Sequence, residues 1–158
     1  MQITVSISDA RVSRSAGDAL ITYSLGSCIG VAVWDPTSLV AGLLHFQLPT
    51  STMDPERSRN APMMFADTGL TWLLDAMKAA GANSRRLKVK IAGGAKMLDS
   101  ASTFDIGRRN HTAIRKVLWQ QGLFVDAEDC GGNQPRTMSI EVASGRVVLK
   151  SRGQTADL

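Results

Sequence analysis

The chain has 158 residues and a formal charge of +4, the difference between 18 Lys and Arg residues and 14 Asp and Glu residues. Hydrophobic residues make up 44% and charged residues 20%, which is ordinary for a globular protein and excludes a disordered chain or a disulfide framework. Because a chain near 150 residues buries about 70% of its unfolded surface, we expect one domain over residues 1–158 with its own core.

Membrane insertion and nucleic-acid binding find little support in the sequence. No apolar run approaches the roughly 20 residues that a membrane-spanning helix needs, and the N-terminus lacks the apolar core of a signal peptide. Aromatic residues make up only 5%, and no compact Lys/Arg block accompanies the pI near 9.4. We therefore expect a cytoplasmic monomer that binds no nucleic acid and does not enter the membrane.

The first part of the chain has the patterns of strands. Apolar and polar residues alternate over residues 2–7, and β-branched or aromatic runs follow at residues 19–23, 29–34 and 39–48. These runs predict four strands, of which the last two form a hairpin around Asp35-Pro36. Residues 50–60 are polar and show no period, so we expect a mobile surface loop there.

Two helices and four further strands are predicted from residue 62 onwards. Apolar residues at three-and-four spacing predict helices over residues 62–80 and 108–121, each followed by a glycine. Short apolar runs predict strands over residues 87–91, 123–127, 137–142 and 146–149, with Ser144-Gly145 as a hairpin turn. Residues 151–158 are expected to fray, and the whole is an α/β or α+β domain.

Two cysteines and two histidines are the candidates for special chemistry. Cys28 and Cys130 show neither CxxC spacing nor a His-rich neighbourhood, so we expect no metal site and no cofactor. A single Cys28–Cys130 disulfide stays open, although the cytoplasm disfavours it. His111 falls in the second predicted helix with no nucleophile near it in the sequence, and we expect it to be a solvated surface residue.

Cys28 has the surroundings that a nucleophile needs. It follows the turn-forming residues Ser24-Leu25-Gly26-Ser27, where the missing side chain of the glycine lets backbone N–H groups converge on the sulfur. A hairpin of the runs at 29–34 and 39–48 would return His45 to the Cys28 end, where it can act as a base. Thr22, on the preceding strand, can reach the same place.

A structural interpretation of these residues competes with the catalytic one. Free cysteines are among the most buried residues and usually serve as small hydrophobes. His45, between apolar neighbours, would then be a core histidine, and Thr22 a strand residue chosen for packing. Each residue alone is uninformative, and only their combination favours catalysis.

Several segments together resemble the CheD family of chemoreceptor glutamine deamidases. They are Leu25-Gly26-Ser27-Cys28, His45-Phe46-Gln47-Leu48-Pro49, Gly93-Gly94-Ala95, Ile106-Gly107 with Asn110, and Gly131-Gly132 with Arg136. Their order and spacing match that family from about Ile21 to Lys150. The resemblance implies a fold similar to the catalytic domains of cytotoxic necrotizing factor toxins, with β-sandwich-like mixed sheets flanked by helices.

The resemblance also implies roles for individual residues. Cys28 is then the nucleophile, His45 the general acid and base, and Thr22 the residue that orients His45. Four further residues are candidates for oxyanion stabilisation or for a substrate groove: Ser27, Gly26, Gly93 and Gly94. Tight packing would explain Gly93 and Gly94 equally well.

The implied activity is hydrolysis of particular glutamine amides on methyl-accepting chemotaxis receptors, which gives glutamate and ammonia through a thioester on Cys28. The same thiol would hydrolyse glutamate methyl esters, because only the leaving group differs. The resemblance further implies a CheC-type phosphatase of the response regulator as a partner. A regulatory binding module, which would not need Cys28, is the alternative from another functional class.

Overall fold

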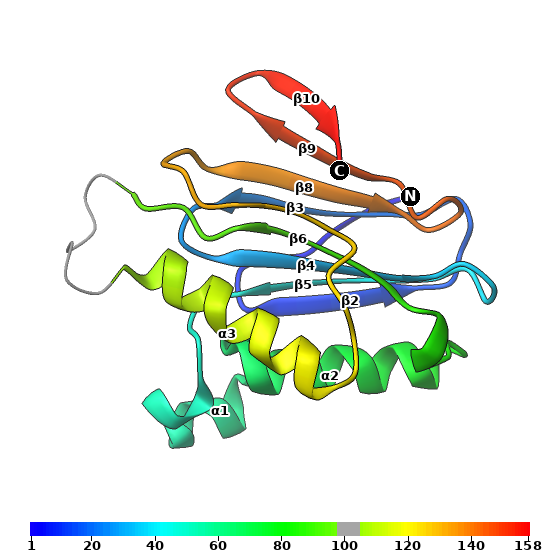
Figure 1. The fold of residues 1–158 in the computed structure, drawn as a ribbon. Coiled ribbons are helices and arrows are strands. Elements are labelled where there is room, and N and C mark those ends of the chain that lie inside the picture. Colours follow the sequence, from blue (N-terminus) through cyan, green and yellow to red (C-terminus); the bar gives the residue numbers. More distant parts are fainter. Residues whose placement is uncertain (98–104) are drawn as a thin grey trace.

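Two five-stranded sheets and a layer of helices make up the fold, which a computed structural model describes for residues 1–97 and 105–158 (Figure 1). In spatial order, sheet A contains β1 (Gln2–Thr4), β3 (Ala19–Leu25), β8 (Arg136–Glu141), β9 (Val147–Ser151) and β10 (Gln154–Asp157). Sheet B contains β2 (Asp9–Ser13), β5 (Val40–Phe46), β4 (Ile29–Asp35), β6 (Lys88–Gly93) and β7 (Ala127–Cys130). Both sheets are mixed, because β1 pairs parallel with β3 and β6 pairs parallel with β7.

The helices cover only one side of this sandwich. The longer ones are α2 (Ala66–Ala79) and α3 (Ile106–Gln120), and both lie on the face of sheet B that points away from sheet A (Figure 1). The shorter ones are α1 (Pro55–Asn60) and the 3-10 turns η1 (Ser51–Met53), η2 (Pro62–Met64) and η3 (Ser84–Arg86). In the described part of the chain, no helix is long and apolar enough to cross a membrane.

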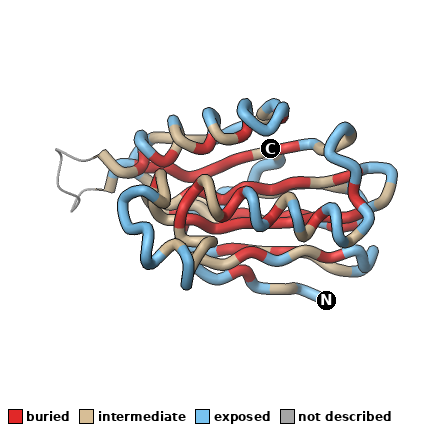
Figure 2. The backbone as a smooth tube through the Cα atoms, turned by 90° about the horizontal axis from the view of Figure 1, so that it is seen from below, coloured by how far each residue is buried: buried red, intermediate tan, exposed pale blue. Residues whose placement is uncertain are grey.

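The central strands β4 and β5 of sheet B are buried on both faces, and this explains their near-continuous apolar sequences. Ile29, Val31 and Val33 of β4 pack against the helices, whereas Ala32 faces sheet A. On β5, Leu44 and Phe46 likewise face the helices while Leu43 faces sheet A. Figure 2 shows the resulting band of buried backbone through the middle of the molecule. A strand buried on both faces loses the alternation of apolar and polar residues.

Much of the expected architecture is confirmed. The sheets form a β-sandwich-like arrangement with helices, although the helices flank one side only. The β4–β5 and β8–β9 hairpins pair antiparallel as expected, and α2 and α3 bury the predicted apolar stripes. The similarity to the toxin catalytic domains stays a prediction.

Three expectations about secondary structure are wrong. Residues 50–60 are not a loop, because they form η1 and α1, and Asp54 caps α1 by accepting a hydrogen bond from the Arg57 N–H. The sequence did not reveal α1 because this short helix has no periodic apolar residues. The strand expected at residues 123–127 lies at 127–130, because the Leu123 side chain packs into the helix-covered core instead. Residues 151–158 do not fray, since β10 pairs with β9 across a turn at Arg152 and Gly153, both with positive φ.

Candidate active site

Cys28 lies where the chain crosses from one sheet to the other. β3 ends at Leu25 in sheet A and β4 begins at Ile29 in sheet B, so only residues 26–28 make the connection. Ser24 adopts a left-handed conformation (φ 59°) at the start of this turn. The Cys28 thiol is free, half-buried and packed against the apolar layer between the sheets. The expected position of the cysteine beside a tight turn is therefore confirmed.

The Gly93-Gly94 pair holds the loop that carries Cys28. The Gly94 N–H donates to the Cys28 carbonyl at 2.9 Å, and the Ala95 N–H donates to the Gly26 carbonyl at 2.8 Å. Gly93 has a φ of +117°, and a Cβ there would lie 2.2 Å from the Cys28 carbonyl oxygen. The close approach at Gly93 is thus to the chain's own backbone, and a side chain there would displace the Cys28 loop. A direct role of these glycines in a substrate groove stays a prediction.

His45 reaches the same layer from sheet B. It lies on β5 opposite Gly30 of β4, on the face that carries Leu43 and points toward sheet A. Because Cys28 is two residues before Gly30, the register puts the thiol and the imidazole on one face, diagonal to each other. The imidazole is 2% exposed. The hairpin that was expected to bring His45 back to the Cys28 end therefore does so.

Thr22 meets His45 across the gap between the two sheets. Thr22 lies on β3 in sheet A and is fully buried, and its Oγ1 is 2.7 Å from Nδ1 of His45. The same hydroxyl is 2.7 Å from the carbonyl oxygen of Val5. The structure therefore brings Thr22 and His45 together in direct contact, with one hydroxyl shared between two partners.

These contacts determine which nitrogen of His45 carries the proton. The Val5 carbonyl only accepts, so the single hydroxyl proton of Thr22 is donated to it. The Thr22 oxygen must then accept a hydrogen bond from His45, which requires the proton on Nδ1. Nε2 is left with a lone pair, and it is buried with no hydrogen-bond partner among the described residues. His45 is thus arranged as a base whose free nitrogen has no other acceptor role.

Burial keeps both groups uncharged. Burial raises the pKa of the Cys28 thiol to about 11, and the N–H of Cys28 itself opposes this rise. Burial lowers the pKa of His45 to about 4. At neutral pH the pair is therefore a thiol and a neutral imidazole rather than a thiolate and an imidazolium. Such a pair can transfer the thiol proton during attack on a carbonyl carbon.

Asn110 links both halves of this arrangement from α3. It is fully buried, and its Nδ2 donates to the carbonyl oxygens of Ser27 at 2.9 Å and of Gln47 at 2.8 Å. Ser27 immediately precedes Cys28, and Gln47 follows His45 by two positions. Apart from its place in the family resemblance, Asn110 had no predicted role. The sequence offers one sign of its importance. Asn110 is a polar residue on the buried stripe of a helix, where Ile114 and Leu118 follow it in steps of four residues.

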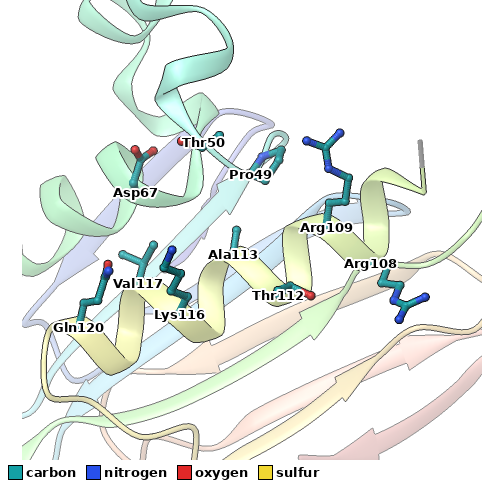
Figure 3. Close-up of a pocket in the computed structure, with 10 residues that line it drawn as sticks. All are labelled: Pro49, Thr50, Asp67, Arg108, Arg109, Thr112, Ala113, Lys116, Val117 and Gln120. Carbon is teal, nitrogen blue, oxygen red and sulfur yellow. The ribbon is translucent and has the colours of Figure 1, made fainter. Parts of the chain in front are cut away.

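A groove runs along α3 next to these residues (Figure 3). It has a volume of about 520 Å³, with α3 on one side and the Pro49–Thr50 segment and Asp67 of α2 on the other. Figure 3 shows Arg109, Ala113, Lys116 and Val117 on the side of α3 that faces this segment. No pattern in the sequence indicated that this side of α3 borders a groove.

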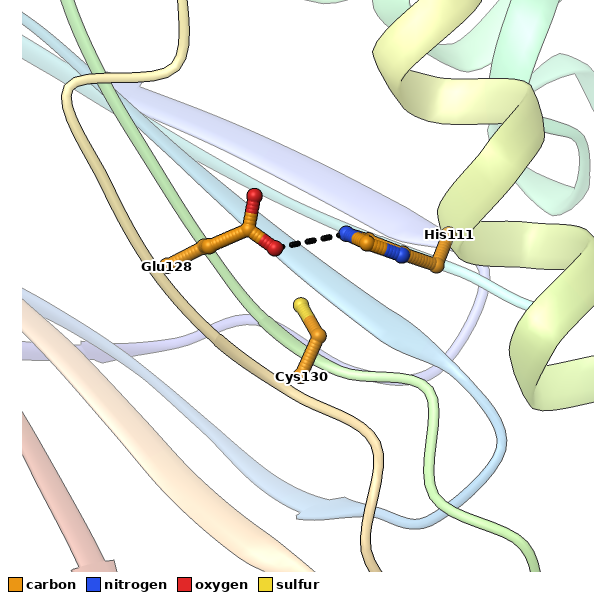
Figure 4. A group of neighbouring side chains, drawn as sticks. All are labelled: His111, Glu128 and Cys130. Carbon is orange, nitrogen blue, oxygen red and sulfur yellow. Dashed lines mark hydrogen bonds and ion pairs between the residues drawn. The ribbon is translucent and has the colours of Figure 1, made fainter.

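His111 lies in a second polar cluster, on the other side of α3 (Figure 4). Its Nε2 is 2.7 Å from Glu128 on β7, and the Cys130 thiol is close to both. The expectation of a solvated histidine without a nearby nucleophile is therefore wrong. Arg115 pairs with the same carboxylate, and burial, then Glu128, raise the pKa of Cys130 to about 12. With its carboxylate balanced by Arg115 and its thiol kept protonated, this cluster tethers α3 to β7.

The two cysteines lie on opposite faces of sheet B. Cys28 packs into the layer between the sheets, whereas Cys130 packs into the layer under the helices. Both are free thiols. The disulfide that the sequence left open is therefore not formed.

Known proteins match this chain along nearly its whole length. The family described as CheD chemotactic sensory transduction matches residues 47–151. A probable chemoreceptor glutamine deamidase CheD from Solibacter usitatus is 46% identical over 99% of this chain and 93% of its own length. Probable chemoreceptor glutamine deamidases from Syntrophus aciditrophicus (CheD 1) and Anaeromyxobacter dehalogenans (CheD 2) are 46% and 44% identical over 96% and 99% of this chain, and over 94% and 98% of their own lengths. The chain therefore belongs to the CheD family.

Proposed function

We propose that this protein hydrolyses the side-chain amides of particular chemoreceptor glutamines to glutamate and ammonia, with Cys28 as nucleophile and His45 as general acid and base. Its relatives carry the name of that activity. The observation that carries the proposal is the buried Thr22–His45 contact, which leaves Nε2 without a partner on the face shared with Cys28. Buried polar atoms are usually hydrogen-bonded, and an unpartnered Nε2 facing the layer that holds Cys28 fits a nitrogen that accepts a proton during the reaction.

The first half of the reaction forms a thioester. As Sγ of Cys28 attacks the amide carbon, Nε2 of His45 takes the thiol proton and the carbonyl electrons move to the oxygen. The resulting imidazolium gives this proton to the amide nitrogen while the carbonyl re-forms, so that the C–N bond breaks and ammonia leaves. The N–H of Cys28 is our candidate donor to the oxyanion.

The second half of the reaction restores the thiol. Neutral His45 takes a proton from water through Nε2 while the water oxygen attacks the thioester carbon. When the carbonyl re-forms, the C–S bond breaks and the imidazolium returns the proton to the departing sulfur. Glutamate is released with one oxygen from water, and both catalytic groups regain their starting protonation states.

In this mechanism Thr22 is a positioning residue. It fixes the ring of His45 and keeps the proton on Nδ1, because its hydroxyl donates a hydrogen bond to the Val5 carbonyl and accepts one from Nδ1. A hydroxyl is neutral and does not balance the charge of an imidazolium as a carboxylate would. The cationic state of His45 is therefore short-lived in this site, which is consistent with a pKa lowered to about 4.

The remaining parts of the proposal rest on the resemblance or on general chemistry. Free cysteines persist in the reducing cytoplasm, and we place the reaction there. A CheC-type phosphatase as second partner, and a monomeric state, belong to the proposal as well. Methyl-ester hydrolysis shares every step except the departure of methanol in place of ammonia, so the same experiment should score both reactions.

The test is mass spectrometry of a chemoreceptor cytoplasmic fragment from the same genome after incubation with the protein. Wild type and Cys130→Ala should convert particular glutamines to glutamate, whereas Cys28→Ala and His45→Ala should not. Cys130→Ala is the matched control because it removes the other free thiol. Conversion by Cys28→Ala, or no conversion of any receptor glutamine by wild type, would overturn the proposal.

A further inference from the structure

The groove along α3 has an excess of positive charge. Its lining includes three basic residues, Arg108, Arg109 and Lys116, and one acidic residue, Asp67. Asp67 is already engaged, since both of its carboxylate oxygens accept hydrogen bonds from Ser51, from the N–H at 3.0 Å and from Oγ at 2.6 Å. The Asp67 carboxylate forms no ion pair with these cations, and one carboxylate against three cations leaves the groove lining with a net positive charge.

The cations of the groove are available to an anion, as are other exposed cations such as Arg14 and Lys88. Arg86, Arg115 and Arg146 each form an ion pair, with Asp35, Glu128 and Asp157 respectively. The charged groups of Arg109 and Lys116 form no ion pair or hydrogen bond with any residue in the two described ranges. Arg109 and Lys116 are thus two unpaired cations on the side of α3 that faces the groove, and they are suited to an anionic partner (Figure 3).

The spacing along α3 defines the shape of that partner. Arg109 and Lys116 are seven positions apart, which is two helical turns or about 10.5 Å along the axis. Ala113 lies between them and Val117 follows Lys116, and both contribute apolar surface to the same side of the helix (Figure 3). A second helix laid along α3, with two carboxylates seven residues apart and a small apolar residue between them, would match both features.

The groove adjoins the proposed active site. Pro49, at its rim, follows Gln47 by two residues, and the Gln47 carbonyl is held by Asn110. Arg109 is the immediate neighbour of Asn110. A helix bound in the groove would thus extend toward the end of the sandwich where Cys28 and His45 lie.

We propose that this groove binds an acidic helical segment of the substrate receptor, with its carboxylates against Arg109 and Lys116, and so selects which glutamine reaches Cys28. The inference rests on the proposed function. It adds the chemical class of the segment that the protein recognises. A receptor glutamine is then a poor substrate when no pair of acidic residues seven positions apart lies near it in the sequence.

The test is charge reversal with a matched control. Arg109→Glu/Lys116→Glu changes the net charge by the same amount as Arg14→Glu/Lys88→Glu, whose exposed residues lie at the end of sheet B remote from His45. We expect kcat/KM for the receptor fragment to fall about tenfold or more in the groove variant and less than about twofold in the control. The difference should shrink at high salt, since the charges are exposed.

Two further measurements separate this inference from the proposed function. The rate at which iodoacetamide alkylates Cys28 reports whether the groove variant keeps its active-site geometry, and it should match wild type. Binding of the receptor fragment to Cys28→Ala protein, with and without the groove substitutions, needs no turnover and should weaken by a similar factor. If wild type deamidates the receptor but the groove variant keeps its kcat/KM and binding within about twofold of wild type, the groove proposal is overturned and the proposed function stands.

Discussion

Replacing Thr22 by valine removes the shared hydroxyl while keeping the shape of the side chain. Thr22 is fully buried and its hydroxyl lies between Val5 and His45, so no water replaces it easily. With a methyl group there, a proton on Nδ1 would face an apolar neighbour. Neutral His45 then prefers the tautomer with the proton on Nε2, and that nitrogen can no longer accept the thiol proton.

The size of the effect follows from two separate losses. Without a working base, the general acid–base contribution disappears, and kcat should fall by about 10²- to 10⁴-fold. The Val5 carbonyl loses its side-chain donor, and an unsatisfied buried group costs about 1–3 kcal/mol of unfolding free energy. Thr22→Ser keeps the hydroxyl and loses one methyl group, so it should retain most of the activity at a stability cost of about 1 kcal/mol.

The assay pairs steady-state deamidation of a receptor fragment with urea denaturation and with ¹⁵N NMR of the His45 ring, which distinguishes the two tautomers. Activity is compared at a urea-free condition where each variant is folded. If Thr22→Val is folded and keeps a kcat within threefold of wild type, the argument that the Thr22 hydroxyl sets the tautomer is refuted. A folded Thr22→Ser variant as inactive as Thr22→Val would refute it too.

Three other perturbations test the rest of the site. The first uses a protein in which Cys130 is replaced by serine, so that only Cys28 reacts with iodoacetamide. The alkylation rate should rise roughly tenfold per pH unit from pH 7 toward 10, because a pKa of about 11 leaves the Cys28 thiol protonated below it. A rate that is flat from pH 5 to 8 would instead indicate a thiolate–imidazolium pair. Asn110→Asp replaces the amide group that donates to the Ser27 and Gln47 carbonyls with a carboxylate that only accepts. We expect kcat to drop at least about tenfold and the unfolding free energy to fall by roughly 2–4 kcal/mol. An unchanged kcat and urea midpoint would show that Asn110 holds neither segment. Gly93→Ala places a Cβ against the Cys28 carbonyl, whereas Gly81 has a similar positive φ with open space around it. Both alanine variants should lose about 1–3 kcal/mol of unfolding free energy, but only Gly93→Ala should change the rate of Cys28 alkylation. Equal alkylation rates in the two variants would show that the loop tolerates the contact.

The sequence predicted the parts of the site that depend on local pairing. The β4–β5 hairpin follows from two apolar runs around Asp35-Pro36, and an antiparallel register then carries His45 to the Cys28 end. The same local logic located α2 and α3, whose apolar stripes are read directly from three-and-four spacing. These elements were predictable because each depends on residues close to one another in the chain.

The contacts between layers were not predictable in this way. The Thr22–His45 hydrogen bond exists because sheet A stacks on sheet B, and no pattern within β3 or β5 encodes that stacking. Asn110 was detectable only as a polar interruption of an apolar stripe, without any indication that it would reach two carbonyls. The strand β7 carries Glu128 and Asp129 at the edge of sheet B, and its parallel pairing with β6 leaves no alternation to recognise.

A neutral, half-buried thiol beside a neutral imidazole has a consequence for selectivity. With a pKa of about 11, only about one Cys28 in 10⁴ is a thiolate at pH 7, so the free site reacts slowly with oxidants and stray electrophiles. Attack then requires a carbonyl carbon held at the sulfur while Nε2 of His45 takes the proton, and the proposed substrate has to be positioned by contacts outside the reacting atoms. The unpaired cations along α3 are suited to supply such contacts, which would make recognition of the receptor segment, rather than intrinsic thiol reactivity, the step that decides which glutamine is converted.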